Sequence, residues 1–232
     1  MYTQRYSPPQ AALPKARPVF QFENVSVDFG ATKALRGINL SVLPKEILFV
    51  TGASGAGKST LLNLMAGLVE PTQGRVQRLS DDSRFFVASV FQDLRLWPQK
   101  SCEQNAWVSY DPRLYDSREQ FHRELLELAR VLGVYEHLAK KIEDCNGGLK
   151  SRVAMLRALL ARPDALLADE PTAALDRDAS FRLFELLNHY NQRKGLTLVW
   201  ATHNREMVKQ FPGKVAHLDQ GRLMHAGQAC FI

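Results

Sequence analysis

The feature that most constrains the fold is the segment ILFVTGASGAGKST, at residues 47–60. Its first five residues are mostly apolar and predict a buried parallel strand. The run LLNLMAGL, which follows the segment, predicts a helix. Between them lies the pattern G-x-x-x-x-G-K-S, in the strand–loop–helix context that this pattern requires. The segment therefore predicts an α/β protein that binds the phosphates of a nucleoside triphosphate.

The residue types of this loop explain why it suits phosphate. Glycines let successive backbone N–H groups curl around phosphate oxygens, and the following helix points its positive end at them. The lysine adds a mobile cation for the β- and γ-phosphates, and the serine hydroxyl can ligate Mg²⁺. A glycine-rich turn in an unrelated α/β protein is the alternative interpretation. The predicted nucleotide-binding residues are Gly52, Ser54, Gly55, Gly57, Lys58, Ser59 and Thr60, with Ser59 also a metal ligand.

Length and composition agree with a globular enzyme. The chain has 232 residues, enough for one large domain or a domain with a subdomain. No stretch approaches the roughly 18 apolar residues of a membrane span. The net charge of +6 could favour a membrane surface or nucleic acid, but phosphate-binding enzymes also carry many basic residues. Because no basic run is interleaved with aromatic residues, we expect no nucleic-acid partner.

The N-terminal residues and the cysteines argue against a secreted, disulfide-rich or metal-binding protein. Residues 1–18 contain prolines and scattered charges but no apolar core, which predicts a flexible tail and not a secretory signal. We expect residues 19–232 to form the folded domain. The three cysteines are far apart in the sequence and odd in number, which favours neither a disulfide framework nor a metal site. A reducing cytosol is the simplest location.

The order of apolar patterns predicts the architecture. Alternating segments at 19–29 and 38–42 predict an antiparallel β patch, with a phase slip at Glu23-Asn24, and a turn follows at 71–74. Buried strands are expected at FFVASVF, ALLADE and LTLVWATH, alternating with helical segments. We expect a mostly parallel sheet whose ligand lies at the carboxyl ends of the strands, with a helical subdomain at about 93–150.

An acidic pair ends the strand ALLADE. Asp169 lies where a P-loop enzyme holds Mg²⁺, directly or through water. Glu170 lies one residue further, where a carboxylate can polarise a water in line with the γ-phosphate. Carboxylates at strand ends are common, but the phosphate loop must converge with this pair at the same sheet edge. The pair is therefore predicted to supply a metal ligand and a catalytic base.

From residue 19 to about 228 the chain resembles the ATP-binding cassette (ABC) family. The resemblance rests on VFQ, NGGLKSRVAMLRALLARP, LLADEPTAALD and ATH, in that order. It implies that Gln92 senses Mg²⁺ and the γ-phosphate, and that His203 contacts the γ-phosphate. It also implies that Ala174-Leu175-Asp176 crosses a dimer interface. Phe29 lies where the family places an aromatic ring against adenine, although a core position is the alternative.

The resemblance is weakest at the family signature. The family usually has Leu-Ser-Gly-Gly-Gln, and this chain has CNGGL at 145–149. The signature caps the nucleotide of the opposite subunit, which implies that role for Asn146, Gly147 and Gly148. Asn146 can donate a hydrogen bond as serine does, but its side chain is longer, and Leu149 removes a polar group. Lys45 stands where the family commonly has glycine.

The resemblance implies an ATPase subunit that forms an ATP-dependent homodimer and drives an integral membrane subunit. The cofactors would be ATP and Mg²⁺, and the chain would lie on the cytoplasmic face of the inner membrane. The segment VFQDLRLWP is similar to the cell-division FtsE branch and to the LolD and MacB-type exporters, which implies an FtsX-like partner or another permease. Such a partner would dock around Leu94, Leu96 and Trp97.

Three other functions stay open from the sequence. A soluble ABC ATPase without a transport role is one, although such relatives usually fuse two cassettes. A weakly hydrolysing subunit paired with a fuller ATPase is another, because the signature is altered. A P-loop kinase is the third, and the Asn-Gly-Gly segment and His203 argue against it.

Overall fold

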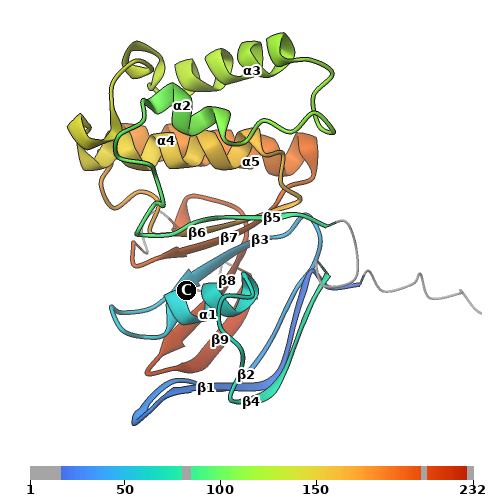
Figure 1. Ribbon diagram of the computed structural model, residues 1–232. Coiled ribbons are helices and arrows are strands. Elements are labelled where there is room, and N and C mark those ends of the chain that lie inside the picture. The colour runs from blue at the N-terminus through green and yellow to red at the C-terminus, as the bar shows by residue number, and fades with distance from the viewer. Residues whose placement is uncertain (1–16, 80–84, 205–207, 229–232) are drawn as a thin grey trace, which may run out of the picture.

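The structure is a computed structural model that describes residues 17–79, 85–204 and 208–228. A central sheet lies between a layer of helices and a second layer that contains α1 (Lys58–Met65) and a small antiparallel sheet (Figure 1). The expected tail lies almost entirely outside the described residues. The boundaries of the folded domain and of its helical subdomain therefore stay predictions.

The central sheet has six strands in the order β5-β6-β7-β3-β8-β9. The strands from β5 to β8 run parallel, and β9 pairs with β8 in the antiparallel sense. The mostly parallel sheet expected from the sequence is confirmed, whereas β9 was not foreseen. The six strands of the central sheet are Val87–Val90 (β5), Ala165–Asp169 (β6), Thr197–Thr202 (β7), Ile47–Thr51 (β3), Lys214–Asp219 (β8) and Arg222–Gln228 (β9).

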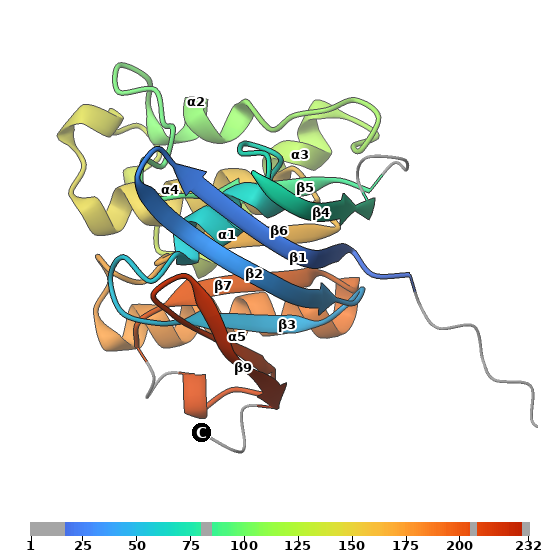
Figure 2. The same cartoon turned by 90° about the horizontal axis from the view of Figure 1, so that it is seen from below.

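The antiparallel patch has three strands, β1 (Phe20–Phe29), β2 (Thr32–Val42) and β4 (Gln73–Arg78), in the order β2-β1-β4. In Figure 2 the β1–β2 pair runs across the face of the molecule that carries α1. The expected phase slip is present, because the register shifts just before Val25 and Asn24 takes a left-handed φ of +50°. The turn expected at 71–74 overlaps the start of β4, a strand that the sequence pattern did not indicate.

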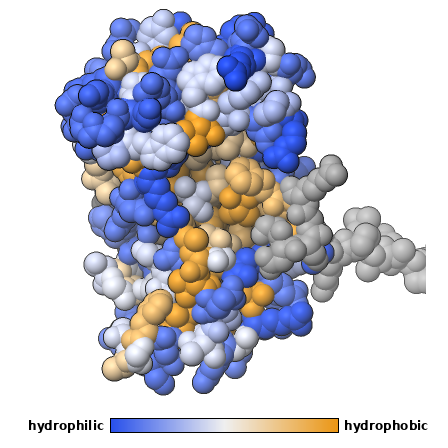
Figure 3. All heavy atoms as spheres, in the orientation of Figure 1, coloured by the Kyte–Doolittle hydropathy of each residue, from blue (hydrophilic) through white to orange (hydrophobic). Residues whose placement is uncertain are grey.

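The helical layer contains α2 (Cys102–Trp107), α3 (Arg118–Val131), α4 (Gly147–Leu160) and α5 (Arg177–Lys194). Two short 3₁₀ helices, Tyr135–His137 and Ile142–Asp144, lie between α3 and α4. The segment from α2 to α4 is inserted between β5 and β6, as the sequence predicted. Among the described residues, none of the helices has the length and apolar character needed to cross a bilayer. In Figure 3 the surface over these helices is largely hydrophilic.

The core is divided by the central sheet into two clusters. Alternate side chains of β3 point to opposite faces, so Phe49 lies in the cluster shared with the helical layer and Val50 lies in the other cluster. The second cluster contains Phe22 of β1 together with side chains of α1. Because the sheet is covered on both faces, its strands β3, β6 and β7 are buried along their whole length, as expected for a parallel sheet.

The turn before β3 explains the preference for glycine at its second position. Lys45 has a left-handed φ of +64°, a conformation that glycine adopts without steric cost. The turn is held to the sheet because the Lys45 N–H donates to Thr197 Oγ1 at 2.9 Å. The departure at Lys45 therefore places a strained residue in an otherwise conventional turn.

Two of the three cysteines are neighbours in space. Cys102 and Cys145 are free and buried, with Sγ atoms 3.7 Å apart. Burial and the hydrogen bond with Cys145 together raise the pKa of the Cys102 thiol to about 12. The Cys102 thiol therefore stays protonated and unreactive at neutral pH. The third cysteine, Cys230, lies outside the described residues.

Candidate functional site

The phosphate loop joins β3 to α1, and its glycines are required by close packing. Gly57 is the N-cap of α1 with φ +103°, and a Cβ there would lie 2.6 Å from the Ala34 carbonyl oxygen. Gly52 has φ +151°, and a Cβ there would lie 2.4 Å from the Leu218 carbonyl oxygen. Any other residue would push the loop away from β2 and β8. These two glycines therefore set the path of the loop.

A cavity of about 620 Å³ opens beside this loop. It is bounded by the carboxyl ends of β5 and β6, by the residue after β7, and by the start of β2. The sequence brings these segments to one sheet edge because the strands are parallel. The predicted site residues that line the cavity are Ser54, Gly55, Gly57, Lys58, Ser59, Thr60, Gln92, Asp169, Glu170 and His203.

Lys58 is held inside the loop that it follows. Its Nζ donates to the carbonyl oxygens of Gly52 at 2.9 Å and Ala53 at 3.1 Å. It also lies 3.7 Å from Glu170 Oε1, and both side chains are nearly buried. Because a buried ammonium group needs such acceptors, its direction is fixed by the loop and by the acidic pair. The cation therefore lies between the phosphate loop and the acidic end of β6.

Glu170 connects Lys58 to His203. It follows β6 with a left-handed φ of +50°, and its N–H donates to the Ala201 carbonyl oxygen at 2.9 Å. Its Oε1 lies 2.9 Å from His203 Nδ1. A left-handed backbone at a non-glycine residue is strained, and such strain often occurs at functional sites. The carboxylate is thus fixed at the cavity wall, where it can accept a proton.

Asp169 has the features expected of a ligand for a divalent cation. Its side chain is buried, and among the described residues its Oδ1 has no hydrogen-bond partner. Burial raises its pKa, the hydrogen bond with Ser59 lowers it, and the charges of Glu170 and Lys58 act in opposite directions. An unpartnered carboxylate oxygen beside a serine hydroxyl fits Mg²⁺, which prefers hard oxygen ligands. The residues present therefore suit this metal ion.

Phe29 lies at the rim of the cavity region and not in the core. Its side chain is 53% exposed, so the alternative interpretation as a core residue is wrong. It pairs in register with Thr32 across the β1–β2 hairpin, and Thr32 lines the cavity. An exposed ring at this position can stack on a base. The adenine contact stays a prediction.

The signature segment lies outside the cavity. Asn146 is the N-cap of α4, and its Oδ1 accepts a hydrogen bond from the Leu149 N–H at 2.8 Å. A Cβ on Gly148 would lie 2.7 Å from the Ala174 carbonyl oxygen, so this glycine lets α4 approach the segment after β6. Asn146 and Gly147 are exposed, and Leu149 is buried. Leu149 therefore serves the core.

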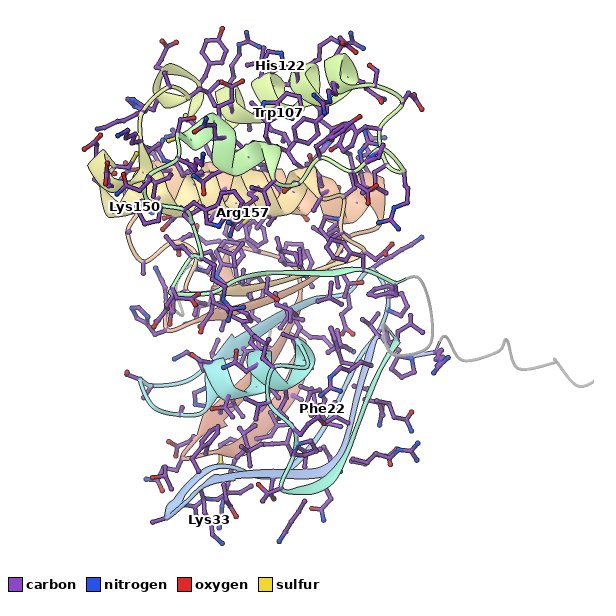
Figure 4. The ribbon with its side chains drawn as sticks, in the orientation of Figure 1. Phe22, Lys33, Trp107, His122, Lys150 and Arg157 are labelled. Carbon is purple, nitrogen blue, oxygen red and sulfur yellow. The ribbon has the colours of Figure 1, made fainter. Side chains whose placement is uncertain are left out.

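Some residues that line the cavity were not foreseen from the sequence. They come from the start of β2 and from the segment after Glu170, and they are Thr32, Lys33, Ala34 and Ala173. In Figure 4, Lys33 lies at the far end of the antiparallel patch from the helical layer. The alternating pattern of 38–42 did not reach far enough back to place β2 beside the loop. A hairpin that pairs Phe29 with the following strand would have placed the start of β2 at the cavity.

The comparison with family models identifies one family. The model described as "ABC transporter" matches residues 35–173. This range contains the phosphate loop, Gln92, the signature segment and the acidic pair. It therefore covers the larger part of the candidate site.

Similar curated proteins carry the name methionine import ATP-binding protein MetN. The protein from Rhizobium etli is 36% identical over 231 residues, which is 95% of this chain and 63% of that protein. The protein from Clostridioides difficile is 32% identical over 220 residues, 90% of this chain and 68% of that protein. The protein from Bifidobacterium longum is 34% identical over 229 residues and is covered to 57% of its length. The chain thus spans about three fifths to two thirds of these relatives.

Solved structures of ATP-binding cassettes have the same fold. The dimeric cassette MJ0796, in a post-hydrolysis state bound to ADP and Pi, superposes with a TM-score of 0.79 at 28% identity, covering 92% of this chain and 100% of that one. CbiO1 from Clostridium perfringens, part of the transporter complex cbiONQ, gives 0.76 at 26% identity, covering 91% and 89%. The chain therefore belongs to the ABC transporter family and contains the ATPase domain of that family.

Proposed function

We propose that this chain binds MgATP in the cavity, hydrolyses it, and drives a membrane permease as a dimer. The single observation that carries the proposal is the composition of the cavity wall. The phosphate loop, Gln92, the acidic pair and His203 face one space of about 620 Å³. Each of these groups has a distinct part in phosphoryl transfer to water.

The geometry supports a separate role for each group. Lys58 binds the β- and γ-phosphates and orients them at the loop. Glu170 takes a proton from the attacking water, and His203 keeps its carboxylate in place through the 2.9 Å contact. Ser59, Gln92 and Asp169 would hold Mg²⁺, which supplies charge neutralisation at the phosphate oxygens. Phe29 stacks on the base.

Dimerisation completes the site in this proposal. The exposed Asn146-Gly147 segment begins α4, whose positive end can face the γ-phosphate in another copy. A hollow of about 710 Å³ that includes Leu175 and Arg177 adjoins the predicted interface segment on the same chain. Turnover by a homodimer should rise with the square of chain concentration in dilute solution. Turnover linear in concentration would indicate that a single copy suffices.

The membrane partner would dock near Trp97. This side chain is 55% exposed, whereas Leu94 and Leu96 are half-buried against the helical core. The relatives named above are methionine import ATP-binding proteins. Their names favour an import ATPase, and they support neither the cell-division branch nor an FtsX-like partner. We therefore infer a permease of this transporter family as the partner.

Co-purification from detergent extracts tests this part of the proposal. The tagged chain should bring down an integral membrane protein, and Trp97→Ala should weaken that association several-fold because it removes the exposed ring. Met224→Ala, which also removes an exposed apolar side chain, is the matched control and should have no effect. Recovery of the chain without any membrane protein would favour the soluble ATPase. Activity that appears only after a second ATPase is added would favour the weakly hydrolysing subunit.

A further inference from the structure

Arg157, on the signature helix α4, reaches across to the segment that follows Gln92. Its Nη1 donates to the Arg95 carbonyl oxygen at 2.6 Å, and its Nη2 donates to the Leu94 carbonyl oxygen at 2.7 Å. Figure 4 places Arg157 on the side of α4 that faces the central sheet. The planar guanidinium group is suited to such paired contacts. One side chain of α4 thus holds two successive carbonyl groups of this segment.

The two residues that Arg157 holds have an unusual backbone. Leu94 and Arg95 have φ values of +49° and +45°. Non-glycine residues rarely adopt this left-handed region, and two in succession persist only when the surroundings fix them. Arg157 satisfies both of their carbonyl oxygens, which the local chain does not satisfy through a helix or a strand. The guanidinium contacts therefore hold this conformation together with the local hydrogen bond from the Leu94 N–H to the Phe91 carbonyl oxygen at 3.0 Å.

A second anchor fixes the other end of the same segment. The fully buried Asn105 of α2 accepts a hydrogen bond from the Trp97 N–H at 2.8 Å and donates to the Trp97 carbonyl oxygen at 3.2 Å. The turn that follows α2 is joined to α4 because Ser109 Oγ donates to the Arg157 carbonyl oxygen at 2.7 Å. Both anchors therefore belong to the helical layer, and neither belongs to the central sheet that carries Gln92.

We propose that Arg157 is a positioning residue that clamps residues 94–97 onto the signature helix. The clamp makes the segment between Gln92 and the exposed Trp97 move with α4 and not with the sheet. A change at the nucleotide site that shifts Gln92 is then passed through a strained, fixed segment to both the docking surface and the signature. This consequence rests on the function proposed above, but the clamp itself rests only on the contacts of Arg157.

Hydrogen–deuterium exchange of the full chain tests the clamp without relying on activity. Arg157→Met keeps much of the aliphatic stem and removes the donors. We expect peptides that cover residues 93–98 to exchange about tenfold faster, with exchange in β3 and β7 unchanged. Arg123→Met on α3, which removes an exposed arginine, is the matched control and should leave these peptides at the parental rate. Parental exchange at 93–98 in Arg157→Met would overturn the proposal.

A conservative variant covers the case in which Arg157→Met does not fold. Arg157→Lys keeps the positive charge but loses the planar pair of donors. It should fold and give an intermediate rate at 93–98. An Arg157→Lys chain with parental exchange there would overturn the clamp.

A second measurement tests the link to the nucleotide. The magnesium complex of adenylyl imidodiphosphate, a nonhydrolysable ATP analogue, should change exchange at 93–98 in the parent. The change should be lost in Arg157→Met, or in Arg157→Lys where that variant is used, although the analogue still binds with similar affinity. An equal change in the variant and the parent would overturn the link. A parent that does not bind the analogue would instead contradict the proposed function, and the clamp would still be decided by exchange without nucleotide.

Discussion

The cavity and the signature segment are two parts of one family site, and they are built differently. In the cavity, Glu170 contacts Lys58 at 3.7 Å and His203 at 2.9 Å. At the signature, Asn146 and Gly147 are exposed, and the Oδ1 of Asn146 accepts a hydrogen bond from the Leu149 N–H of its own helix. One region is assembled by the fold of a single chain. The signature segment is positioned by the fold of the chain, but in the proposed dimer it would act on the nucleotide of another copy.

This difference shows that two motifs of one chain can depend to different degrees on a partner subunit. The cavity residues lie at the ends of parallel strands, so the hydrogen bonds of the sheet position them. The signature lies at the start of a helix, which fixes its position, and in the proposed dimer its ligand would come from another copy. Changes in the cavity should therefore act on one copy, and changes at the signature should depend on dimer formation.

The largest expected effect tests whether Glu170 in the cavity activates the attacking water. Glu170→Gln should slow ATP hydrolysis by about 10²–10⁴, the range for a positioned general base, with MgATP binding retained. Steady-state turnover and nucleotide affinity of the purified chain would be compared. Glu127→Gln on the exposed surface of α3 is the control and should keep the parental rate. Hydrolysis at the parental rate in Glu170→Gln would show that another group activates the water.

The next effect separates two uses of Asn146. Asn146→Asp keeps a good N-cap but removes the amide donor, whereas Asn146→Ala removes both. We expect Asn146→Ala to lower the free energy of unfolding by about 1 kcal/mol and Asn146→Asp to leave it nearly unchanged. ATP-driven dimerisation should weaken in both, by roughly 0.5–3 kcal/mol.

Denaturation and sedimentation would give the two quantities for Asn146. Asn146→Ser, which restores the usual residue of the family and also caps well, should match the parent in stability and dimerise at least as well. If Asn146→Asp dimerises as the parent does, the residue is a cap alone. The two regions would then differ more clearly, because the cavity would act through side chains and the signature only through its glycines.

The smallest effect concerns the stability of the nucleotide-free chain. Burial raises the pKa of Asp169, so the folded chain binds a proton at this carboxyl more tightly than the unfolded chain does. The Asp169 carboxyl therefore lowers the free energy of unfolding as the pH rises. Asp169→Asn should raise the free energy of unfolding at pH 7 by about 1 kcal/mol, the low end of the range for an unsatisfied buried group. The gain should shrink as pH falls through the raised pKa and vanish below the ordinary value of 3.8.

Urea denaturation between pH 4.5 and 8 would measure the effect of Asp169→Asn. The same variant should lose the extra stabilisation that Mg²⁺ adds to bound ATP, because a metal ligand is gone. A variant as stable as the parent at every pH would show that Oδ1 carries no strain. The cavity would then resemble the signature segment, with residues that are relaxed before a ligand arrives.

The sequence by itself determined the phosphate loop, the acidic pair and the types of most elements. These signals are local: glycine spacing, apolar periodicity and the residues that end a strand all act within about ten residues. The short strands β4 and β9 were missed because six or seven residues with mixed polarity carry little periodicity. Their partners, β1 and β8, supply the hydrogen bonds that make them strands.

Only the tertiary structure decided how distant residues meet. Thr32 and Lys33 line the cavity because β2 runs beside the loop, and Leu149 is buried although its family counterpart is polar. The capping bond of Asn146 and the grip of Arg157 on Leu94 and Arg95 depend on side-chain direction and on helix packing. Such contacts join residues up to 63 positions apart. No local pattern encodes them, because their energy appears only when the layers pack together.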